Sequence, residues 1–455
     1  MGGLDTYTEG LGGPQKSAFD GIVQFLTMGG GGFYLLSGYA GTGKTFLMGR
    51  VLQYIQQTSQ RPVALTCPTH KALKVLMHHT QAKDLYTTHA YLGMREEIDI
   101  NGNQIFRKPK TFAKPPPCEN YMITIVDEAS MVADEIFDEL EYMITSGHKV
   151  IFVGDPMQIP PINYTDSLPF MRSVQRDLSF HTGHLDEIIR QVAGNPIIAT
   201  SMEIRNNISS PIPALSYQNH TEGLLGVRYA EKRASKELMQ DILDMFASSY
   251  FKIDPDYVKI IAWTNDEVDK YNKKVREHLF GKGLPNIIVG DKLTANAPFM
   301  EGTQYLVKNN EDMEVLEVEV IDDQFSPTET LQVNRALVKV FGMKGESREA
   351  VIRIIHEESE AYFNKRLEDL KTLAKVEKKG TYQSKSRWID YYKLKERYAN
   401  VKYGYAITAH KSQGSTYDHA VILLYDMLHN NRTVERNRIL YTAVTRPKYT
   451  LRIIF

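Results

Sequence analysis

The chain has 455 residues, 42% of them hydrophobic and 24% charged, with a formal net charge of −1, a composition typical of a soluble globular protein. The length predicts two to four domains. The balanced charge excludes a global attraction to nucleic acid or anionic membranes, so such binding needs local clusters of Lys and Arg. No apolar run approaches the roughly 20 residues that cross a bilayer, no signal-peptide pattern opens the chain, and two cysteines are too few for a disulfide framework, which predicts a cytosolic protein without a membrane partner.

A phosphate-binding pattern stands near the start of the chain. A predicted amphipathic helix over 13–26 is followed by a short apolar strand, by the run Gly38-Tyr39-Ala40-Gly41-Thr42-Gly43-Lys44-Thr45, and by a predicted helix over 46–57. Gly-x-x-x-x-Gly-Lys-Thr between a strand and a helix is the P-loop pattern. Its backbone surrounds phosphate oxygens, Lys44 reaches the β- and γ-phosphates, and the Thr45 hydroxyl ligates Mg²⁺. A chance match in a glycine-containing turn is the alternative. The expected nucleotide contacts are Gly38, Ala40, Gly41, Thr42, Gly43, Lys44 and Thr45.

Strands and helices then alternate. Residues 62–67 predict a buried strand, and residues 71–80 predict a helix after the turn Pro68-Thr69-His70. This repetition predicts an α/β fold with a parallel sheet and helices on both faces. Residues 98–106 break the pattern, because apolar residues alternate about Asn101-Gly102, which indicates a β-hairpin with a two-residue turn. We interpret 97–118, with its basic and proline-rich tail, as a hairpin that projects from the sheet. A surface excursion without a role is the alternative.

A pair of carboxylates supplies the second chemical clue. A predicted strand over 122–128 ends in Asp127-Glu128, followed by a predicted helix over 133–144 and a strand over 149–155. Phosphoryl transfer to water needs a carboxylate at Mg²⁺ and a group that orients and deprotonates the water, roles that suit Asp127 and Glu128 respectively. An acidic pair that favours a helix start is the alternative. A small-molecule kinase does not need Glu128, and the sequence lacks the guanine signature of GTPases.

A second series of elements follows. Between its two parts, a chain segment with short β-type runs suits a small β-barrel. The stretch 361–400 holds eleven Lys or Arg against five Asp or Glu, interleaved with aromatic residues. It suits either contact with a displaced strand or a solvated helical hairpin with aromatic packing inside. The predicted strands of the second series are 258–263, 405–408, 420–424 and 451–455, the predicted helix is 266–279, and the short β-type runs are 286–289, 313–321, 331–340 and 351–355.

Together these stretches resemble the ordered motifs of superfamily 1 helicases. The run Thr408 to Thr416 resembles motif V of the RecD-like type, which moves 5′ to 3′. The compact length most resembles the Dda helicases of T-even-like phages. The resemblance covers nearly the whole chain and is weakest over 195–255 and 286–400. The runs that carry it are Gly38 to Thr45, Thr66 to Ala72, Thr87 to Ala90, Asp127 to Ser130, Gly154 to Pro161, Trp263 to Asp269, Thr408 to Thr416 and Tyr441 to Arg446.

The resemblance implies two RecA-like domains that share one ATP site. Gln15 resembles the glutamine that reads adenine, and Gln158 resembles the motif III glutamine that senses the γ-phosphate. Arg190 and Arg446 resemble the arginines that the second domain contributes to the cleft, where domain closure would bring their charge to the transferring phosphoryl group. A surface salt bridge is the alternative for either arginine. Gly414 of motif V is a further expected nucleotide contact.

The resemblance also implies a track for single-stranded DNA. Hydroxyls, imidazoles and helix starts at strand ends suit contacts with the nucleic-acid backbone, and for each residue a capping or turn role is the alternative. Phe106 in the hairpin is a candidate for stacking on a base pair at the fork, with a hydrophobic foot of the hairpin as the alternative. The other expected contacts are Pro68, Thr69, His70, Thr88, His89, Thr264, Asn265, Thr408 and His410.

We therefore expect a first RecA-like domain over 1–183 with a hairpin pin at about 97–118, and a second over 184–282 and 401–455. An SH3-like β domain over 283–400 would carry a basic and aromatic insertion at about 356–400. The expected activity is unwinding of fork or duplex DNA, with ATP and Mg²⁺, by a monomer that translocates 5′ to 3′ on single strands.

A single-strand-binding protein or a replisome component is a candidate partner, and the host cytosol is the expected location if the chain is phage-encoded. The alternatives are a P-loop ATPase that switches a protein assembly, and a translocase or RNA helicase without productive DNA unwinding. A nuclease subunit is disfavoured because the sequence shows no extra carboxylate cluster.

Overall fold

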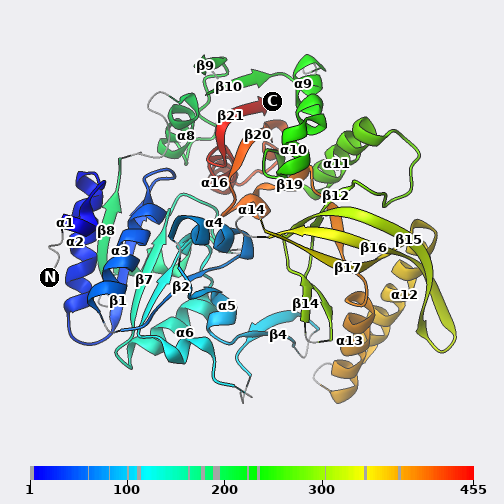
Figure 1. Cartoon of the computed structure of the whole chain (residues 1–455), viewed down its shortest axis with the longest axis horizontal. Helices are drawn as coiled ribbons and strands as arrows, with labels where there is room; N and C mark the ends of the chain where they lie inside the picture. Colours follow the sequence, from blue (N-terminus) through cyan, green and yellow to red (C-terminus); the bar gives the residue numbers. More distant parts are fainter. Residues whose placement is uncertain are drawn as a thin grey trace. The chain divides into compact units, whose positions relative to one another are not determined.

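The chain forms two compact units, each with its own sheets and hydrophobic core residues (Figure 1). The first unit contains residues 1–93, 111–268 and 407–455, and the second contains 94–110 and 269–406. In the described part of the chain, no helix is long and apolar enough to cross a membrane. The computed structural model describes all residues except 1–4, 60, 81, 100–101, 110–113, 162–163, 176–179, 188–194, 223–224, 233–235, 303, 343–345 and 378–380.

The first unit contains two six-stranded sheets, and the sheet that carries the P-loop is parallel throughout. Its strand order is β3-β2-β6-β7-β1-β8. Because parallel strands end at the same edge of a sheet, the loops after β1, β2, β6 and β7 gather along one edge, where such sheets bind ligands. The strands are β1 (Gly32–Gly38), β2 (Val63–Cys67), β3 (Leu85–Thr87), β6 (Ile123–Val126), β7 (Lys149–Gly154) and β8 (Phe180–Leu185).

Short helices connect these strands. In α2, buried apolar residues recur at helical spacing, and Pro14 stands in the first turn, where its missing N–H costs nothing. The helices are α1 (Asp5–Thr8), α2 (Gly13–Thr27), α3 (Lys44–Thr58), α4 (His70–Thr80), α5 (Thr88–Tyr91), η1 (Pro117–Asn120), η2 (Ala129–Met131), α6 (Asp134–Ile144) and α7 (Leu168–Gln175).

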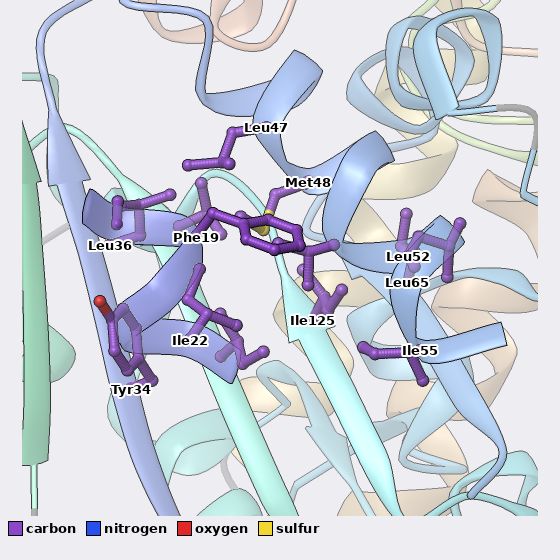
Figure 2. Close-up of a cluster of buried hydrophobic side chains, with 14 of the residues drawn as sticks. Phe19, Ile22, Tyr34, Leu36, Leu47, Met48, Leu52, Ile55, Leu65 and Ile125 are labelled. Carbon is purple, nitrogen blue, oxygen red and sulfur yellow. The ribbon is translucent and has the colours of Figure 1, made fainter. Parts of the chain in front are cut away.

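The core beneath the P-loop joins α2 and α3 to the sheet (Figure 2). Phe19 and Ile22 from α2, Leu36 from β1, Leu47 from α3 and Leu65 from β2 are all fully buried. Burial of each such side chain stabilises the fold by about 1.5–3 kcal/mol. This packing fixes the end of β1 relative to the start of α3, and so holds the loop between them.

The second sheet of the first unit has the order β19-β11-β20-β21-β10-β9. Its central strands are parallel, and β9 at the edge is antiparallel to β10. Helices α8 and α16 pack on it and on each other through a core that includes Ile197, Ile204 and Leu440. The strands are β9 (His220–Glu222), β10 (Leu225–Ala230), β11 (Val258–Ala262), β19 (Ala406–Thr408), β20 (Tyr417–Leu423) and β21 (Pro447–Ile454).

Six helices accompany this sheet, and a further helix, α11 (Asn265–Phe280), starts in the first unit and continues into the second. The six are α8 (Pro196–Asn206), α9 (Lys236–Ala247), α10 (Ser249–Ile253), α14 (Ala409–Ser412), α15 (Leu424–Met427) and α16 (Thr433–Val444).

The second unit is built on an antiparallel sheet of order β17-β16-β15-β12-β18. Leu394 near the end of α13 and Tyr398 just after it pack on Leu331 and Val333 of the sheet, which joins the helices of this unit to its strands. The elements are β4 (Arg95–Ile98), β5 (Gln104–Arg107), β12 (Lys292–Ala295), β13 (Phe299–Glu301), β14 (Gln304–Val307), β15 (Asp312–Ser326), β16 (Glu329–Phe341), β17 (Ser347–Ile355), α12 (Glu357–Val376), α13 (Tyr382–Lys395) and β18 (Val401–Tyr403).

The predicted α/β class with a parallel sheet is confirmed, but the expected strand at 286–289 is wrong. The backbone N–H of Ile288 donates to the buried carboxylate of Asp291 at 2.9 Å, and Gly290 has φ of +90°. These residues form a turn because Asp291 closes it and also binds Arg276. The first strand of this sheet is instead β12, which the sequence patterns missed.

The expected two-residue turn at Asn101-Gly102 falls in part outside the described residues, which leave out 100 and 101. β4 and β5 pair from Arg95 with Arg107 to Ile98 with Gln104, and the backbone of Asp99 bonds to that of Asn103. Asp99 also accepts hydrogen bonds from the backbone and side chain of Asn103 at 2.7 and 3.0 Å. Gly102 has φ of +83°, a conformation that favours glycine.

Candidate nucleotide-binding site and nucleic-acid interface

The predicted P-loop lies between β1 and α3 at the carboxyl edge of the first sheet. Gly41 and Gly43 have φ of +84° and +76°, a conformation that residues with a Cβ rarely adopt. The Lys44 ammonium donates to the carbonyls of Gly38 and Tyr39 at 3.0 and 2.8 Å. The loop is thus a curved backbone that holds a cation at the start of a helix, an arrangement that suits phosphate oxygens.

Gln15 bonds to the P-loop from α2. Its side chain is buried, Nε2 donates to the carbonyl of Thr42 at 3.0 Å, and Oε1 accepts from the backbone of Gly12 at 3.1 Å. A Cβ on Gly43 would lie 2.4 Å from that Nε2, so the close approach needs glycine there. In this arrangement Gln15 supports the loop, and its contact with adenine stays a prediction.

Asp127 and Glu128 follow β6 at the same edge. Glu128 is in the left-handed conformation, with φ of +55°, and its N–H donates to Oδ1 of Asp127 at 2.8 Å. For a residue with a side chain this conformation costs on the order of 1–2 kcal/mol. Burial, reinforced by the charge of Asp127, raises the pKa of the neighbouring Cys67 thiol, which keeps it protonated beside the carboxylates. The residue expected to act on water therefore has a strained backbone between the end of β6 and the start of η2.

Asp155, in the turn after β7, is a buried junction between the two sheets of the first unit. Its Oδ1 accepts from the backbone of Met157 at 3.0 Å, and its Oδ2 accepts from the hydroxyl of Tyr441 at 2.6 Å. Arg205 forms an ion pair with Oδ1 at 3.4 Å. Tyr441 lies on α16 and Arg205 on α8, so both partners come from helices that pack on the second sheet.

The same two helices contact the P-loop itself. The hydroxyl of Tyr441 accepts a 3.3 Å hydrogen bond from the backbone N–H of Ala40. The guanidinium carbon of Arg205 lies 3.9 Å from the ring centroid of Tyr39. Burial, together with the charge of Asp155, raises the pKa of Tyr441, so the phenol stays protonated and remains a donor. The nucleotide loop is therefore bonded across the junction of the two sheets.

Gln158 lies in the same turn as Asp155. Its side chain is 5% exposed, and its Oε1 is buried without a hydrogen-bond partner among the residues that the structure describes. The next residue, Ile159, is held from the second sheet, because its N–H donates to Thr442 at 3.2 Å and its carbonyl accepts from Gln413 at 3.0 Å. A buried acceptor of this kind suits a ligand or an attacking water.

The structure describes only one of the two predicted arginine fingers, Arg446. Arg446 is 6% exposed, and its guanidinium donates to Thr442, Ser415 and Thr445 at 2.8, 3.2 and 2.9 Å. These partners all belong to the region of the second sheet. Arg190 lies outside the described residues. The role of each in hydrolysis stays a prediction.

Two of the expected nucleic-acid loops follow strands of the first sheet. Pro68 and Thr69 connect β2 to α4, which begins at His70, and the Thr69 hydroxyl caps that helix by accepting from Ala72 at 3.2 Å. Thr88 is fully buried at the start of α5, and its hydroxyl has no hydrogen-bond partner within the described ranges.

The imidazoles of His89 and His410 share one electrostatic property. Burial lowers the pKa of each, so both rings are neutral at pH 7. Neutral imidazoles offer a phosphate a hydrogen bond rather than a full positive charge. The contact of either ring with a nucleic acid stays a prediction.

The expected contacts from the second sheet lie at strand ends too. Thr264 precedes α11, which begins at Asn265, and both its N–H and its hydroxyl donate to the buried carboxylate of Asp426, at 2.9 and 2.8 Å. Thr408 caps α14 by accepting from Lys411 at 3.3 Å. Asp426, which the sequence patterns did not single out, therefore fixes the Thr264 turn.

Gly414 and Phe106 lie in different units. Gly414 has φ of +72°, and a Cβ there would lie 2.7 Å from the Cβ of Ala72. The structure thus brings it against α4, and its contact with nucleotide stays a prediction. Phe106 lies on β5 of the second unit, opposite Glu96, and is 41% exposed. That exposure is compatible with stacking on a base, and the role stays a prediction.

Sequence reasoning gave no role to three residues that the structure brings to the P-loop. Asp155 and Tyr441 stand in the recognised runs Gly154 to Pro161 and Tyr441 to Arg446, but nothing in those runs indicates that the two side chains pair. Arg205 lies in the stretch 195–255, where no motif was recognised, so only the structure identifies it. Its position depends on how α8 packs on the second sheet.

Comparisons with known proteins agree with this architecture. Residues 14–222 match the family model of the AAA domain, and residues 403–454 match that of the UvrD-like helicase C-terminal domain. The chain is 27% identical to the ATP-dependent DNA helicase dda of Enterobacteria phage T4, over 98% of each protein. It is 32% identical to the ATP-dependent RecD2 DNA helicase of Deinococcus radiodurans, over 42% of this chain and 23% of that protein.

A solved structure is similar in fold. The Pif1 helicase from Candida albicans matches with a TM-score of 0.52 at 15% sequence identity, over 98% of this chain and 94% of that one. At this identity the match concerns the fold alone.

Proposed function

We propose that this chain, a superfamily 1 helicase by its similarity over its full length to the phage T4 protein, is an ATP-dependent DNA helicase that translocates 5′ to 3′ on single-stranded DNA. The observation that carries the proposal is the bond from Tyr441 to both Ala40 and Asp155. A P-loop that is bonded to the helix of a second sheet can transmit the state of its nucleotide as a movement between the two sheets. That coupling is what a motor requires.

The roles in hydrolysis follow from the chemistry of the groups. Lys44 binds the β- and γ-phosphates of ATP, and Glu128 accepts a proton from the attacking water. The buried Oε1 of Gln158 supports a role in orienting that water. Arg446 must exchange its present carbonyl partners for phosphate oxygens, so its charge reaches the reaction only when the second domain moves.

The oxygen donors expected for Mg²⁺ fit that ion. The Thr45 hydroxyl and the Asp127 carboxylate are hard ligands, and among the described residues no group of three or more His, Cys, Asp or Glu could hold a metal ion by itself. One hydroxyl and one carboxylate suit an ion that is carried largely by the nucleotide phosphates. When bound, Mg²⁺ would neutralise charge on those phosphates.

For DNA we propose a track along the strand-end loops of both sheets of the first unit. The loops that begin at Pro68, Thr88, Thr264 and Thr408 present helix starts and neutral hydrogen-bonding groups, which suit a nucleic-acid backbone read without base specificity. Alternating grip by the two domains during ATP turnover would then move the strand in steps.

We assign strand separation to the second unit, with β4 and β5 as a pin and the sheet β17-β16-β15-β12-β18 as an SH3-like domain. The turn of the pin is supported by α13, since a Cβ on Gly102 would lie 2.1 Å from the Trp388 ring. Tyr392 donates to the carbonyl of Gly102 at 2.8 Å, and Gln104 donates to Glu396 at 3.0 Å. A hairpin braced in this way can resist the force of a base pair.

A P-loop ATPase that switches a protein assembly is the second candidate, because the P-loop and its coupled second sheet would serve that function as well. The two functions differ in what stimulates hydrolysis. We further propose that the chain acts as a monomer, with a single-strand-binding protein or a replisome component as a partner on DNA.

Steady-state ATP hydrolysis with and without single-stranded DNA tests the proposal. A helicase should hydrolyse ATP at least tenfold faster with the DNA, because the strand stabilises the closed arrangement of the two domains. A rate of ATP hydrolysis that neither DNA nor RNA increases would refute the helicase and favour the assembly switch. Stimulation by RNA alone would favour the RNA helicase.

A further inference from the structure

Arg205 carries a buried positive charge from α8 to the P-loop. Its side chain is 10% exposed, and its guanidinium carbon lies 3.9 Å from the ring centroid of Tyr39. Arginine over an aromatic face at this distance is an attractive contact, worth about 2 kcal/mol when it is desolvated. The helix positions the residue because the preceding Ile204 is buried in the core of the second sheet.

The polar contacts of this guanidinium are weak for a buried group. Its ion pair with Asp155 spans 3.4 Å, and its Nε is buried without a hydrogen-bond partner among the described residues. By contrast, Arg276 in the second unit has the same 10% exposure and makes bonds of 2.7 and 3.0 Å to Asp291. Because each single contact of this buried charge is weak, its position depends on all of its neighbours together. Small displacements of those neighbours should therefore change its energy.

The neighbours of Arg205 belong to the two nucleotide-facing loops of the first sheet. Tyr39 lies in the P-loop between β1 and α3, and Asp155 lies in the turn that contains Gln158. Both loops therefore meet one side chain from the second sheet. If the second sheet moved away by a few ångströms, the stacking contact and the ion pair would be lost together.

We propose that Arg205 is a positioning residue that couples the closure of the second domain to the P-loop and to the turn of Gln158. It acts by holding Tyr39 and Asp155 against α8, and so aligns the loops that contact the ATP phosphates. This inference rests on the proposed function, because domain closure matters only if the chain is a nucleotide-driven motor. The role adds to those of the two predicted arginine fingers and does not require contact with the nucleotide.

The test is Arg205→Gln, which keeps most of the side chain and removes the charge. Two quantities are measured: kcat and KM for ATP in the presence of single-stranded DNA, and the change in DNA affinity caused by a non-hydrolysable ATP analogue. We expect kcat to fall at least tenfold while KM changes less than about threefold. We also expect the effect of the analogue on DNA affinity to shrink toward none, since the coupling between the two sites is reciprocal. Arg205→Lys should restore little, because an ammonium cannot stack as a guanidinium does.

A matched control separates positioning from stability. Arg276→Gln removes an arginine of the same burial from a tighter ion pair in the second unit, so it should lower the melting temperature at least as much. It should leave kcat per folded molecule and the effect of the analogue within about twofold of the parent. If Arg205→Gln also leaves the effect of the analogue unchanged, or if it raises KM with kcat intact, the inference is overturned.

Failure of the proposed function would look different. If single-stranded DNA does not increase the rate of ATP hydrolysis by the parent protein, the helicase proposal is refuted. The inference about Arg205 is then tested by ATP hydrolysis without DNA. There, the losses caused by Asp155→Asn and Arg205→Gln should be less than additive in a double-mutant cycle, because Arg205 acts in part through Asp155. Additive losses in log kcat would overturn the inference by themselves.

Discussion

The hydroxyl of Tyr441 lies 2.6 Å from the carboxylate of Asp155 and bonds two sheets of the first unit to each other. The same oxygen accepts the backbone N–H of Ala40 at 3.3 Å, so one side chain of α16 contacts the P-loop and the turn after β7 together. The arrangement makes the nucleotide loop sensitive to the position of the second sheet.

Tyr441→Phe tests this bond. The substitution leaves the buried carboxylate of Asp155 with one donor fewer and leaves Ala40 without its acceptor, which costs about 1–3 kcal/mol. We expect a lower midpoint of urea unfolding and a fall of at least tenfold in DNA-stimulated kcat, with ATP affinity changed less than threefold. Steady-state kinetics and urea titration measure these effects. An unchanged kcat would show that the bond is structural only.

Glu128 combines backbone strain with a proposed catalytic role, so two substitutions separate the two. Glu128→Gln keeps the left-handed backbone and removes the base, and it should abolish at least 99% of turnover while ATP still binds. Glu128→Gly also removes the base but relieves the strain, so it should be more stable than Glu128→Gln by about 1 kcal/mol. ATP hydrolysis and thermal unfolding report the two effects. Turnover retained in both variants would refute the assignment of Glu128.

Phe106→Ala tests the pin. Phe106 is exposed on β5, so its loss should leave the fold and the single-strand-stimulated ATPase nearly unchanged, while duplex unwinding falls at least fivefold. Tyr305→Ala is a matched control, since Tyr305 is an exposed aromatic residue on β14 of the same unit, and it should unwind normally. Equal loss of ATPase and unwinding in Phe106→Ala would indicate a folding defect and contradict the pin.

The stability of the first unit should depend on the protonation of His148. Burial lowers the pKa of this imidazole to about 4, and its Nε2 lies 2.6 Å from the Thr124 hydroxyl, which is bonded in turn to Tyr91. The unfolded chain, with a pKa near 6.5, binds the proton more readily, so stability is full above pH 6.5 and is lost as the pH falls toward 4. The loss attributable to this group is roughly 3 kcal/mol.

Urea unfolding at several pH values checks this dependence. His148→Gln retains a side chain that can bond to Thr124 and does not titrate, so its stability should change less than that of the parent between pH 6.5 and 4. The difference between the two curves isolates His148 from the other buried histidines. Parallel curves would contradict the neutral, buried imidazole.

The sequence was informative wherever local pattern and chemistry agree. The P-loop, the strands β1, β2, β6 and β7 and the carboxylate pair were predicted, because a buried apolar run followed by Gly-x-x-x-x-Gly-Lys-Thr or Asp-Glu has few other meanings. The strands β3 and β8 of the same sheet were not predicted. The expected alternation of strands and helices matches the parallel sheets of the first unit. Each of these signals is contained in one short stretch of consecutive residues.

Relationships between distant segments could not be predicted in the same way. The contacts of Arg205 with Tyr39 and Asp155 depend on the packing of α8, which has no distinctive sequence pattern. The turn at 286–289 was mistaken for a strand because Ile287, Ile288 and Val289 form a short run of β-branched residues, whereas the buried carboxylate of Asp291 decides its shape. Tertiary hydrogen bonds outweighed local propensity there.

Unwinding of tailed duplexes tests the central claim most directly. A duplex with a 5′ single-stranded tail and one with a 3′ tail are each mixed with the protein, ATP and Mg²⁺, and strand separation is followed over time, with Lys44→Ala as the inactive control. We predict ATP-dependent unwinding of the 5′-tailed duplex and little unwinding of the 3′-tailed one. Preferential unwinding of the 3′-tailed duplex, or unwinding of neither, would contradict the account.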